Sequence, residues 1–478
     1  MNNFQDREGE LATLEGLYEH PGSKLVVLYG RRRLGKTTLL GRFAKSKPCV
    51  YYMADKAAEV SQRNALARAM GDALNESILA QASYSEWYDL FAAFDRLRDP
   101  TKKTILVLDE YQYLCQTDRA FSSLIQKWWD EHWKQGNVML VLCGSLTSMM
   151  YRETLSHSSP LYGRSDASIL LRPLPYSHVR AFLPSVTETH CVERYALCGG
   201  VPRYLELLSA FADFDAALTR GILAPSAPLH AEARYLLQDE IDVPNVCWSL
   251  LEAIASGATR ISEMASRLQQ PANSLTRYLS LLRDLSIVRR SVPVSEKNPS
   301  RSKRGVYDIT DPFLRLWFGC VYPYESYFEL DATLAALERL RPLLDHHIQY
   351  CYEELCRHYT KAHLTSGTGT INVGRQWTAH YEIDVAAVNE KYQFTLLGEC
   401  KWSRKKVGLS VLDHLQETAK RESLPLAANI QWLLFSRSGF TKALIQHANT
   451  TPTVRLISSL FSAEAGGGGG GESVVGSR

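Results

Sequence analysis

The stretch KLVVLYGRRRLGKTTLL, residues 24–40, decides the fold of the first part of the chain. An apolar run, a loop of the form G-x-x-x-x-G-K-[ST] from Gly30 to Thr37 and a helical pattern follow one another, which is the context of a phosphate-binding loop. Glycines let backbone N–H groups turn inward around phosphates, and the positive end of the following helix adds to the attraction. The sequence therefore predicts a P-loop NTPase fold that binds ATP.

The loop supplies contacts to both nucleotide and metal. We expect Lys36 to reach the terminal phosphates and the Thr37 hydroxyl to ligate Mg²⁺. Thr38 offers a second hydroxyl that could be aligned in its place. The predicted nucleotide-binding residues are Gly30, Arg31, Arg32, Arg33, Leu34, Gly35, Lys36, Thr37, Thr38 and, further along the chain, Ser145.

Short apolar strands alternate with helical stretches as far as residue 175. Such strands are typical of a parallel sheet covered on both faces, which predicts a doubly wound α/β domain. One of them ends in Asp109 and Glu110, at the carboxyl edge where these sheets bind ligands. Asp109 is expected to hold the hydration shell of Mg²⁺, and Glu110 to orient or deprotonate the attacking water. The expected strands cover residues 24–30, 48–54, 103–111, 137–145 and 167–174.

Three further features resemble AAA+-like or STAND-type ATPases. Ser145 ends a strand where a γ-phosphate sensor would lie, and Arg164 is placed like an arginine finger acting in cis or in trans. The segment GGVPRYL, residues 199–205, is similar to the helical-lid motif. The alternatives are a surface arginine at position 164 and a plain helix–turn–helix corner at 199–202.

The stretch VGRQWTAHYEIDVAAVNEKYQFTLLGECKW, residues 373–402, is the second informative one. The pattern predicts one strand ending at Asp384, a turn at 389–391 and a strand carrying Glu399 and Lys401. Residues two apart share one face of a strand, so Glu399 and Lys401 would meet Asp384 across a hairpin. Two carboxylates and a lysine suit a Mg²⁺-dependent nuclease. The carboxylates would hold the metal, and the lysine would position or activate water or neutralise the phosphate.

This constellation resembles the PD-(D/E)xK nuclease superfamily. The resemblance implies a restriction-endonuclease-like α/β fold and a glutamate from the first helix, for which Glu353 is favoured and Glu354 is the alternative. Gln416 is placed like the glutamine that a later helix sometimes adds. Domains of this kind can also lose cleavage and persist as modules that bind DNA or protein.

Between these regions, helical patterns and a basic turn predict a winged helix over residues 241–310, with a recognition helix at 271–286. Its wing would contact DNA phosphates, and binding would then depend on salt. The alternative is a spacer between the two outer domains. The basic residues of the wing are Arg289, Arg290, Lys297, Arg301, Lys303 and Arg304.

Several segments occur in an order that resembles the archaeal-type ATPase family over about residues 3–460. They are FQDREGEL, the P-loop, LDEYQYL, PLYGR, CGGVPRYL and YDITDPFLRLWF. The resemblance implies a P-loop ATPase domain, a winged helix and a C-terminal domain long catalogued as of unknown function. The expected domains are the ATPase domain at 1–175, a helical lid at 176–240, the winged helix at 241–310, a nuclease-like domain with a helical lead-in at 311–465 and a flexible glycine-rich tail at 466–478.

Composition narrows the partners and the location. No apolar run approaches the ~18 residues of a membrane-spanning helix, and the polar start MNNFQDREGE lacks a signal-peptide pattern, so we expect a cytoplasmic protein without a membrane partner. The net charge of +3 neither demands nor forbids nucleic acid. The scattered cysteines predict buried thiols rather than a disulfide or zinc framework.

Two functions fit these features. The first is an ATPase whose nucleotide state gates DNA binding and Mg²⁺-dependent DNA cleavage. The second is a STAND-like switch whose C-terminal half binds DNA or protein without cleaving. A finger acting in trans would also require a homo-oligomer.

Overall fold

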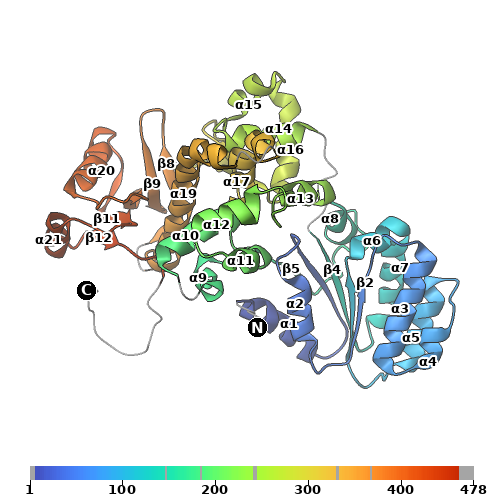
Figure 1. Ribbon diagram of the computed structural model, residues 1–478. Coiled ribbons are helices and arrows are strands. Elements are labelled where there is room, and N and C mark those ends of the chain that lie inside the picture. The colour runs from blue at the N-terminus through green and yellow to red at the C-terminus, as the bar shows by residue number, and fades with distance from the viewer. Residues whose placement is uncertain are drawn as a thin grey trace. The chain divides into compact units, whose positions relative to one another are not determined.

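The computed structural model describes residues 6–145, 148–183, 186–240, 245–329, 333–366 and 369–461 (Figure 1). The predicted glycine-rich tail lies outside these residues. The chain divides into two compact units. The first comprises Met1–Phe182, Leu197–Arg289 and Tyr307–Glu338, and the second Leu183–Ala196, Arg290–Val306 and Arg339–Arg478. The predicted domain boundaries stay predictions, because this division separates two units only.

The first unit contains a parallel five-stranded sheet in the order β2–β3–β4–β1–β5. Its strands are β1 Lys24–Gly30, β2 Cys49–Met53, β3 Thr104–Asp109, β4 Val138–Ser145 and β5 Ala167–Leu170. This confirms a doubly wound α/β domain with strands close to the predicted positions. The order places β4 between the strand that leads into the P-loop and the strand that ends in Asp109.

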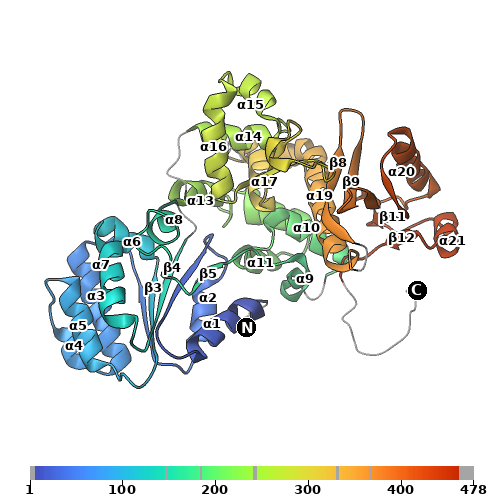
Figure 2. The same ribbon diagram turned by 180° about the vertical axis from the view of Figure 1, so that it is seen from behind.

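Helices cover both faces of this sheet, with α1 and α2 on one face and α3, α5 and α7 on the other (Figure 2). The helices are α1 Glu8–Glu19, α2 Lys36–Phe43, α3 Glu59–Leu74, α4 Ser77–Gln81, α5 Trp87–Leu97, α6 Tyr111–Thr117, α7 Phe121–Trp128, η1 Trp129–Trp133 and α8 Ser148–Thr154. Apolar side chains of the strands pack against α3, α5 and α7 in one buried cluster, which includes Val27, Leu66, Phe91, Leu108 and Ile125.

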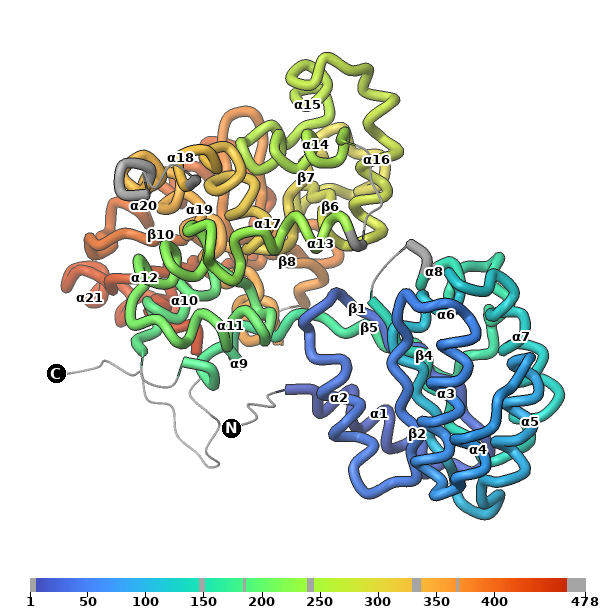
Figure 3. Tube along the Cα trace, turned by 45° about the vertical axis from the view of Figure 1, so that its right-hand side comes forward, coloured from blue at the N-terminus to red at the C-terminus, as the bar shows by residue number. Residues whose placement is uncertain are grey.

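The rest of the first unit is mostly helical. Its elements are α9 Tyr176–Val179, η2 Arg180–Phe182, α11 Pro202–Ser209, α12 Phe214–Leu218, η3 Thr219–Leu223, α13 Glu232–Glu240, α14 Asn245–Ala255, α15 Ile261–Leu268, α16 Ala272–Asp284, α17 Pro312–Leu316, η5 Trp317–Val321, η6 Tyr322–Tyr324 and α18 Glu325–Glu329. Helices α14, α15 and α16 pack against one another (Figure 3). A short two-stranded sheet follows them in the chain, formed by β6 Val288–Ser291 and β7 Val306–Ile309. The loop between these strands, with η4 Pro299–Arg301, belongs to the second unit.

The second unit contains a mixed five-stranded sheet in the order β12–β11–β10–β9–β8. Strands β8, β9 and β10 are antiparallel neighbours, whereas β10, β11 and β12 run parallel. Helices α20 Leu409–Arg421 and α21 Lys442–Thr450 pack on this sheet through Leu412, Leu415 and Leu444. The strands are β8 Thr370–Trp377, β9 Glu382–Asn389, β10 Phe394–Lys401, β11 Leu426–Ser436 and β12 Val454–Ile457.

Two helices from separate stretches of the chain join this second unit. They are α19 Thr333–His363, a long helix, and α10 Glu188–Cys198. His347 Nε2 of α19 lies 2.7 Å from the carbonyl oxygen of Ala196 on α10. Most of α10 therefore belongs to this unit, although the helix lies within the stretch predicted as a lid. None of the described helices combines the length and the apolar character needed to cross a bilayer.

Candidate functional site

The P-loop joins β1 to α2 in the predicted order. Gly35 precedes the first turn of α2 with φ 89°, a left-handed conformation that favours glycine. The next residue, Lys36, is buried, and its Nζ donates to the carbonyl oxygens of Gly30 (2.8 Å) and Arg31 (3.2 Å). The ammonium group therefore lies over the loop itself, where phosphate oxygens would compete for its protons.

Asp109 lies at the end of β3 and binds three donors. Its carboxylate accepts hydrogen bonds from the Thr37 hydroxyl (3.2 Å), the Tyr51 hydroxyl and the backbone N–H of Glu110 (2.9 Å). This contact favours Thr37 over Thr38 as the metal-binding hydroxyl. Tyr51, on the neighbouring strand β2, was not predicted. Burial, together with the Asp109 charge, raises the pKa of Tyr51, so this hydroxyl stays protonated and donates.

Glu110 follows in a left-handed conformation, with φ 51° and ψ 42°. Its carboxylate accepts hydrogen bonds from the Ser145 hydroxyl, at 3.4 Å, and from the Gln112 amide. Ser145 in turn pairs with Gly30 in the register of β4 and β1. The structure therefore brings the predicted sensor serine, the predicted water-orienting glutamate and the P-loop to one edge of the sheet.

The three arginines of the P-loop contact protein side chains. Arg31 Nη1 lies 2.6 Å from Asp311 Oδ2, and both side chains are buried. Arg33 Nη2 lies 2.7 Å from Glu232 Oε2, and Arg32 Nη2 donates to the Tyr113 hydroxyl at 2.9 Å.

Two of these partners belong to the segments that follow the sheet: Glu232 begins α13, and Asp311 is the N-cap of α17. Glu232 also accepts a hydrogen bond from Tyr204 of α11, at 2.7 Å. The predicted nucleotide contacts of Arg31 and Arg33 would thus compete with carboxylates. Leu34 is buried and offers only its backbone to a ligand.

Arg164 lies far from the P-loop of its own chain. It forms a bidentate pair with Asp130 of η1, with Nη2 2.7 Å from Oδ2. Two residues later, Asp166 accepts a hydrogen bond from the backbone N–H of Leu25 at the amino end of β1. The P-loop begins at the opposite end of that strand, at Gly30. Within one chain, Arg164 and the P-loop therefore lie at opposite ends of the strands, which is unfavourable for a finger acting in cis. A finger acting in trans and a plain surface arginine both stay as predictions.

The segment 199–205 forms a tight corner between α10 and α11. A Cβ atom on Gly200 would lie 1.9 Å from the carbonyl oxygen of Leu174, so only glycine fits there. Pro202 occupies the first turn of α11, where its fixed φ suits a helix start. The corner is observed, whereas a lid role for this motif stays a prediction.

In the second unit, the predicted carboxylates and lysine meet on β9 and β10. The register pairs Val385 with Gly398, which sets Asp384 and Glu399 at adjacent positions. Asp384 Oδ2 accepts from the backbone N–H of Cys400 at 2.8 Å, and Lys401 Nζ lies 2.7 Å from Glu399 Oε2. The predicted single strand ending at Asp384 is wrong, because residues 378–381 separate β8 from β9 and Asp384 lies near the start of β9.

Burial and the neighbouring charge of Glu399 raise the pKa of Asp384 to about 7. Burial and the charge of Asp384 likewise raise the pKa of Glu353 to about 7. Burial alone would lower the pKa of Lys401, but Glu399 and Asp384 outweigh it, and the pKa is raised. The cluster therefore holds a firmly protonated lysine beside carboxylates whose negative charge is costly without a cation.

Helix α19 contributes Glu353 to this cluster, and Glu354, the alternative, pairs with Arg357, with the guanidinium Nε 3.1 Å from Oε1. Gln349 donates to Glu353 Oε1 (2.7 Å) and to the carbonyl oxygen of Cys400 (3.0 Å). Arg357 donates to the carbonyl oxygen of Asp384 at 2.6 Å. Gln349 and Arg357 were not predicted, although they flank Glu353 at i−4 and i+4 on one helical face.

A role for Gln416 of α20 in this cluster stays a prediction. Helix α20 turns Leu412 and Leu415 toward the sheet, and His414 lines the pocket beside Glu399. Gln416 lies two positions beyond His414, about 200° around the helix, and is not among the residues that line that pocket.

The chemistry of these donors fits Mg²⁺, which proteins hold through one or two carboxylates together with water and phosphate oxygens. Asp109 with Thr37 would hold it in the first unit, and Asp384 with Glu399 in the second. Within the described part of the chain, no three or more His, Cys, Asp or Glu side chains are grouped so as to hold a metal ion.

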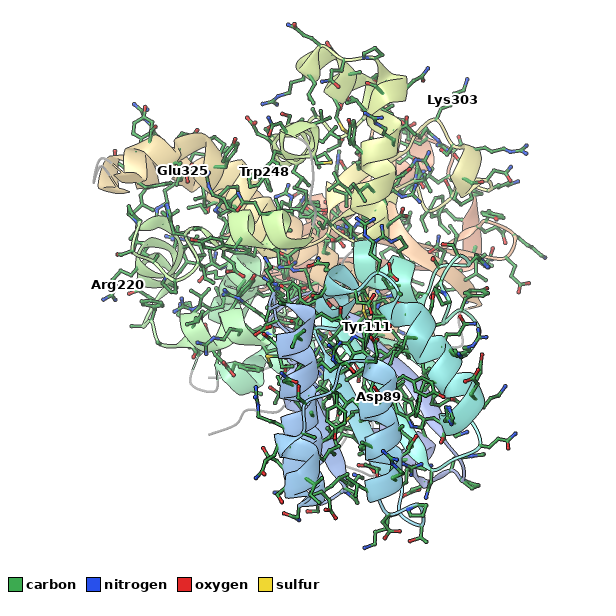
Figure 4. All side chains as sticks on the ribbon, turned by 90° about the vertical axis from the view of Figure 1, so that its right-hand side faces the viewer. Asp89, Tyr111, Arg220, Trp248, Lys303 and Glu325 are labelled. Atoms are coloured by element: carbon green, nitrogen blue, oxygen red, sulfur yellow. The ribbon has the colours of Figure 1, made fainter. Side chains whose placement is uncertain are left out.

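The predicted basic wing divides into two kinds of residue. Arg290 donates to the carbonyl oxygens of Pro299 (2.8 Å) and Ser302, and Arg304 pairs with Glu296 at 2.9 Å, so these two hold the loop together. Lys297, Arg301 and Lys303 are exposed. Figure 4 labels Lys303 among side chains that project outward from this loop.

Comparison with known families agrees with this geometry. Residues 4–208 match the model of a family described as an ATPase domain predominantly from Archaea. This part of the chain is a P-loop ATPase domain. Residues 317–414 match a second family, described as archaeal and bacterial proteins of unknown function.

Two relatives from one archaeon are described as uncharacterized proteins. One protein of Methanocaldococcus jannaschii is 28% identical over 408 residues, covering 84% of this chain and 88% of its own length. An uncharacterized ATP-binding protein of the same organism is 43% identical over 44 residues, covering 9% of this chain and 75% of its own length. Among solved structures, the Walker-type ATPase of Pyrococcus abyssi is similar with a TM-score of 0.47 and 21% identity, covering 66% of this chain and 95% of that one.

Proposed function

We propose that this protein binds and hydrolyses ATP with Mg²⁺, and that its nucleotide state controls DNA binding and metal-dependent DNA cleavage by the second unit. The cleavage part of the proposal is supported chiefly by the convergence of Asp384, Glu399, Lys401 and Glu353 on one edge of a mixed sheet. The ATPase part is supported by the P-loop, Asp109 and Glu110.

In the ATPase domain, Lys36 and the loop N–H groups would hold the phosphates, and Thr37 with Asp109 would hold the metal. Glu110 would accept a proton from the attacking water, steadied by Ser145 and Gln112. Tyr51 orients Asp109 from the neighbouring strand. Mg²⁺, when bound, neutralises charge on the phosphates.

In the second unit, Asp384 and Glu399 would hold Mg²⁺, and Glu353 would orient a water toward it. Because its pKa is raised, Lys401 is suited to neutralising the phosphate and not to taking a proton. Bound Mg²⁺ would lower the pKa of a water and supply the nucleophile. DNA would be held in addition by the predicted winged helix, through α16 and the exposed cations of the wing.

Communication between nucleotide and the rest of the chain would run through the P-loop arginines. Arg31 and Arg33 pair with Asp311 and Glu232, which belong to the segments after the sheet. Phosphates that attract either guanidinium would weaken those pairs and release α13 or α17. We also propose that copies of the chain associate into a homo-oligomer through the edge of the sheet that carries Arg164.

The test is cleavage of plasmid and single-stranded DNA with Mg²⁺ or Mn²⁺, with and without ATP. Wild type is compared with Lys36→Ala, Asp384→Ala and, as a matched control, Asp413→Ala, an exposed acid on α20. Cleavage that is lost in Asp384→Ala and kept in Asp413→Ala supports the nuclease. The Lys36→Ala protein reports whether ATP gates cleavage.

A second function is a switch that hydrolyses ATP and binds DNA or protein without cleavage. One observation favours it: Asp384 Oδ2 and Glu399 Oε2 are already engaged by Cys400 N–H and Lys401. ATP turnover with no cleavage from any variant, in either metal, would select this function.

A further inference from the structure

A pocket of about 130 Å³ lies beside Glu399, between β9, β10 and α20. Its lining combines both signs of charge, with the floor provided by Ile383 and Leu415. The residues around it are His380, Tyr381, Glu382, Ile383, Glu399, His414, Leu415, Thr418 and Arg421. A water occupies about 30 Å³ in the liquid, so the pocket has room for a group a few waters in size and not for a base pair.

One side of the pocket, which carries the guanidinium of Arg421, comes from one stripe of α20. His414, Thr418 and Arg421 follow one another at i, i+4 and i+7, which places them on the same flank of the helix. The apolar face next to this stripe, with Leu412 and Leu415, anchors the helix to the sheet. These contacts fix the position of the stripe relative to β9 and β10.

The acids of the pocket already have basic partners on β10 and on the neighbouring strand β8. Glu399 Oε2 lies 2.7 Å from Lys401 Nζ, and Glu382 Oε1 lies 3.7 Å from Arg375 Nη1. Arg421 contacts Glu422 at 3.2 Å, but 60% of its side chain is exposed, and such surface pairs are weak. An anion entering the pocket would thus displace little to reach the guanidinium.

We propose that this pocket is a subsite for a phosphodiester group of DNA, with Arg421 and His414 as its ligands. Arginine presents a planar fork that matches phosphate oxygens, and the imidazole adds one donor at the wall shared with Glu399. Glu399 lines this pocket, and it shares one face of β10 with Lys401. The phosphate held in the pocket would therefore be a neighbour, along the DNA strand, of the phosphate bound at the carboxylates. The inference rests on the proposed function, and it adds how the DNA strand is positioned at the carboxylates.

The experiment measures DNA affinity by fluorescence anisotropy, in Mg²⁺, with a short labelled duplex and with its single strand. All proteins carry Asp384→Asn, so that binding is observed without cleavage. Arg421→Gln and His414→Gln are compared with Lys420→Gln, which removes a charge from the adjacent exposed position that does not line the pocket. Thermal melts of each variant exclude loss of folding as the cause.

We expect Arg421→Gln to weaken binding about tenfold, the loss of one charge-assisted contact. The slope of log affinity against log salt should shrink by about one, and Lys420→Gln should change it less. Equal effects of Arg421→Gln and Lys420→Gln, with His414→Gln like the parent, would overturn the subsite. Absence of cleavage by the protein with Asp384 intact would count against the nuclease alone, whereas Arg421-dependent binding would still support the subsite.

Discussion

Glu110 has a left-handed backbone that a residue other than glycine adopts only when its surroundings fix it. Gln112 and Ser145 supply that restraint and aim the carboxylate at the P-loop edge. We expect Glu110→Gln to bind ATP normally and to hydrolyse it about 10²-fold more slowly, because an amide cannot accept a proton from water. Phosphate release and equilibrium ATP binding measure the two effects.

Lys36→Ala is the matched control for that prediction, since it removes the phosphate contact itself. It should lose ATP binding and turnover together. Unchanged ATP turnover in Glu110→Gln would show that another residue orients the attacking water. Full ATP affinity in Lys36→Ala would contradict the P-loop assignment.

Asp384 and Glu353 have pKa values raised to about 7, well above the ~4 of carboxyls in an unfolded chain. Between these values the folded protein binds more protons than the unfolded chain, so the free energy of unfolding falls as pH rises from about 4 to about 7. We expect the melting temperature of the metal-free protein to fall as the pH rises across this range. The melting temperature of Asp384→Asn should fall less.

Mg²⁺ sharpens that measurement, because a cation between the carboxylates offsets their repulsion. Added Mg²⁺ should raise the melting temperature of wild type near pH 8 more than that of Asp384→Asn. Asp413→Asn, which changes an exposed acid on α20, should follow wild type in both respects. If Asp384→Asn has the same pH profile as wild type, burial of the Asp384 carboxylate does not lower the free energy of unfolding.

At the scale of elements, the loop between β6 and β7 separates two roles that the sequence grouped together. Arg290 ties the loop to the carbonyl oxygens of Pro299 and Ser302, whereas Lys303 is exposed. We expect Lys303→Gln to weaken DNA binding and reduce its salt slope by about one, without changing the melting temperature.

Arg290→Gln should behave differently and lower stability by about 1 kcal/mol for each hydrogen bond lost. Anisotropy titrations at several salt concentrations and thermal melts separate the two effects. If Lys303→Gln binds DNA with the affinity and salt slope of wild type, the wing does not contact phosphate.

The elements that could be predicted are those whose own residues determine them. The apolar runs of β1, β3 and β4 and the glycines of the P-loop specify that part of the fold locally. The pairing of Glu399 and Lys401 follows from strand periodicity. The break at 378–381, the strand β12 and the partner Tyr51 depend on tertiary contacts between distant segments, which no local pattern encodes. For the same reason the sequence did not single out His414, which lines the pocket beside Glu399: the face of α20 is decided by what the helix packs against.

At the scale of the whole molecule, Arg164 tests whether copies of the chain cooperate. It lies at the edge of the sheet opposite its own P-loop, so Arg164→Ala should leave turnover unaffected at concentrations where the protein is monomeric. Where copies associate, Arg164→Ala should lower turnover. In a mixture with wild type, the variant should also reduce the turnover of the wild-type copies next to it. Additive rates in the mixture would exclude the trans role, and sedimentation supplies the oligomeric state for each assay.

The contact between Arg31 and Asp311 gives the clearest test of coupling between nucleotide and the helices beyond the sheet. Both side chains are buried, and Asp311 also accepts the N-cap hydrogen bond from Leu314 at 2.8 Å. Asparagine is an equally good N-cap, so Asp311→Asn keeps the start of α17 and removes only the charge that attracts Arg31. If phosphate and Asp311 compete for this guanidinium, the variant should bind ATP more tightly, by up to about tenfold.

Amide hydrogen exchange of α17 distinguishes competition from a purely structural pair. In wild type, ATP should speed exchange in α17 because Arg31 is drawn toward the phosphates, and in Asp311→Asn exchange should be insensitive to ATP. Arg203→Gln, on the exposed side of α11 with Glu206 as its partner, controls for the loss of an ion pair elsewhere. An Asp311→Asn protein that melts earlier yet binds ATP as wild type does would make the pair a structural contact, and coupling would then have to run through Arg33 and Glu232.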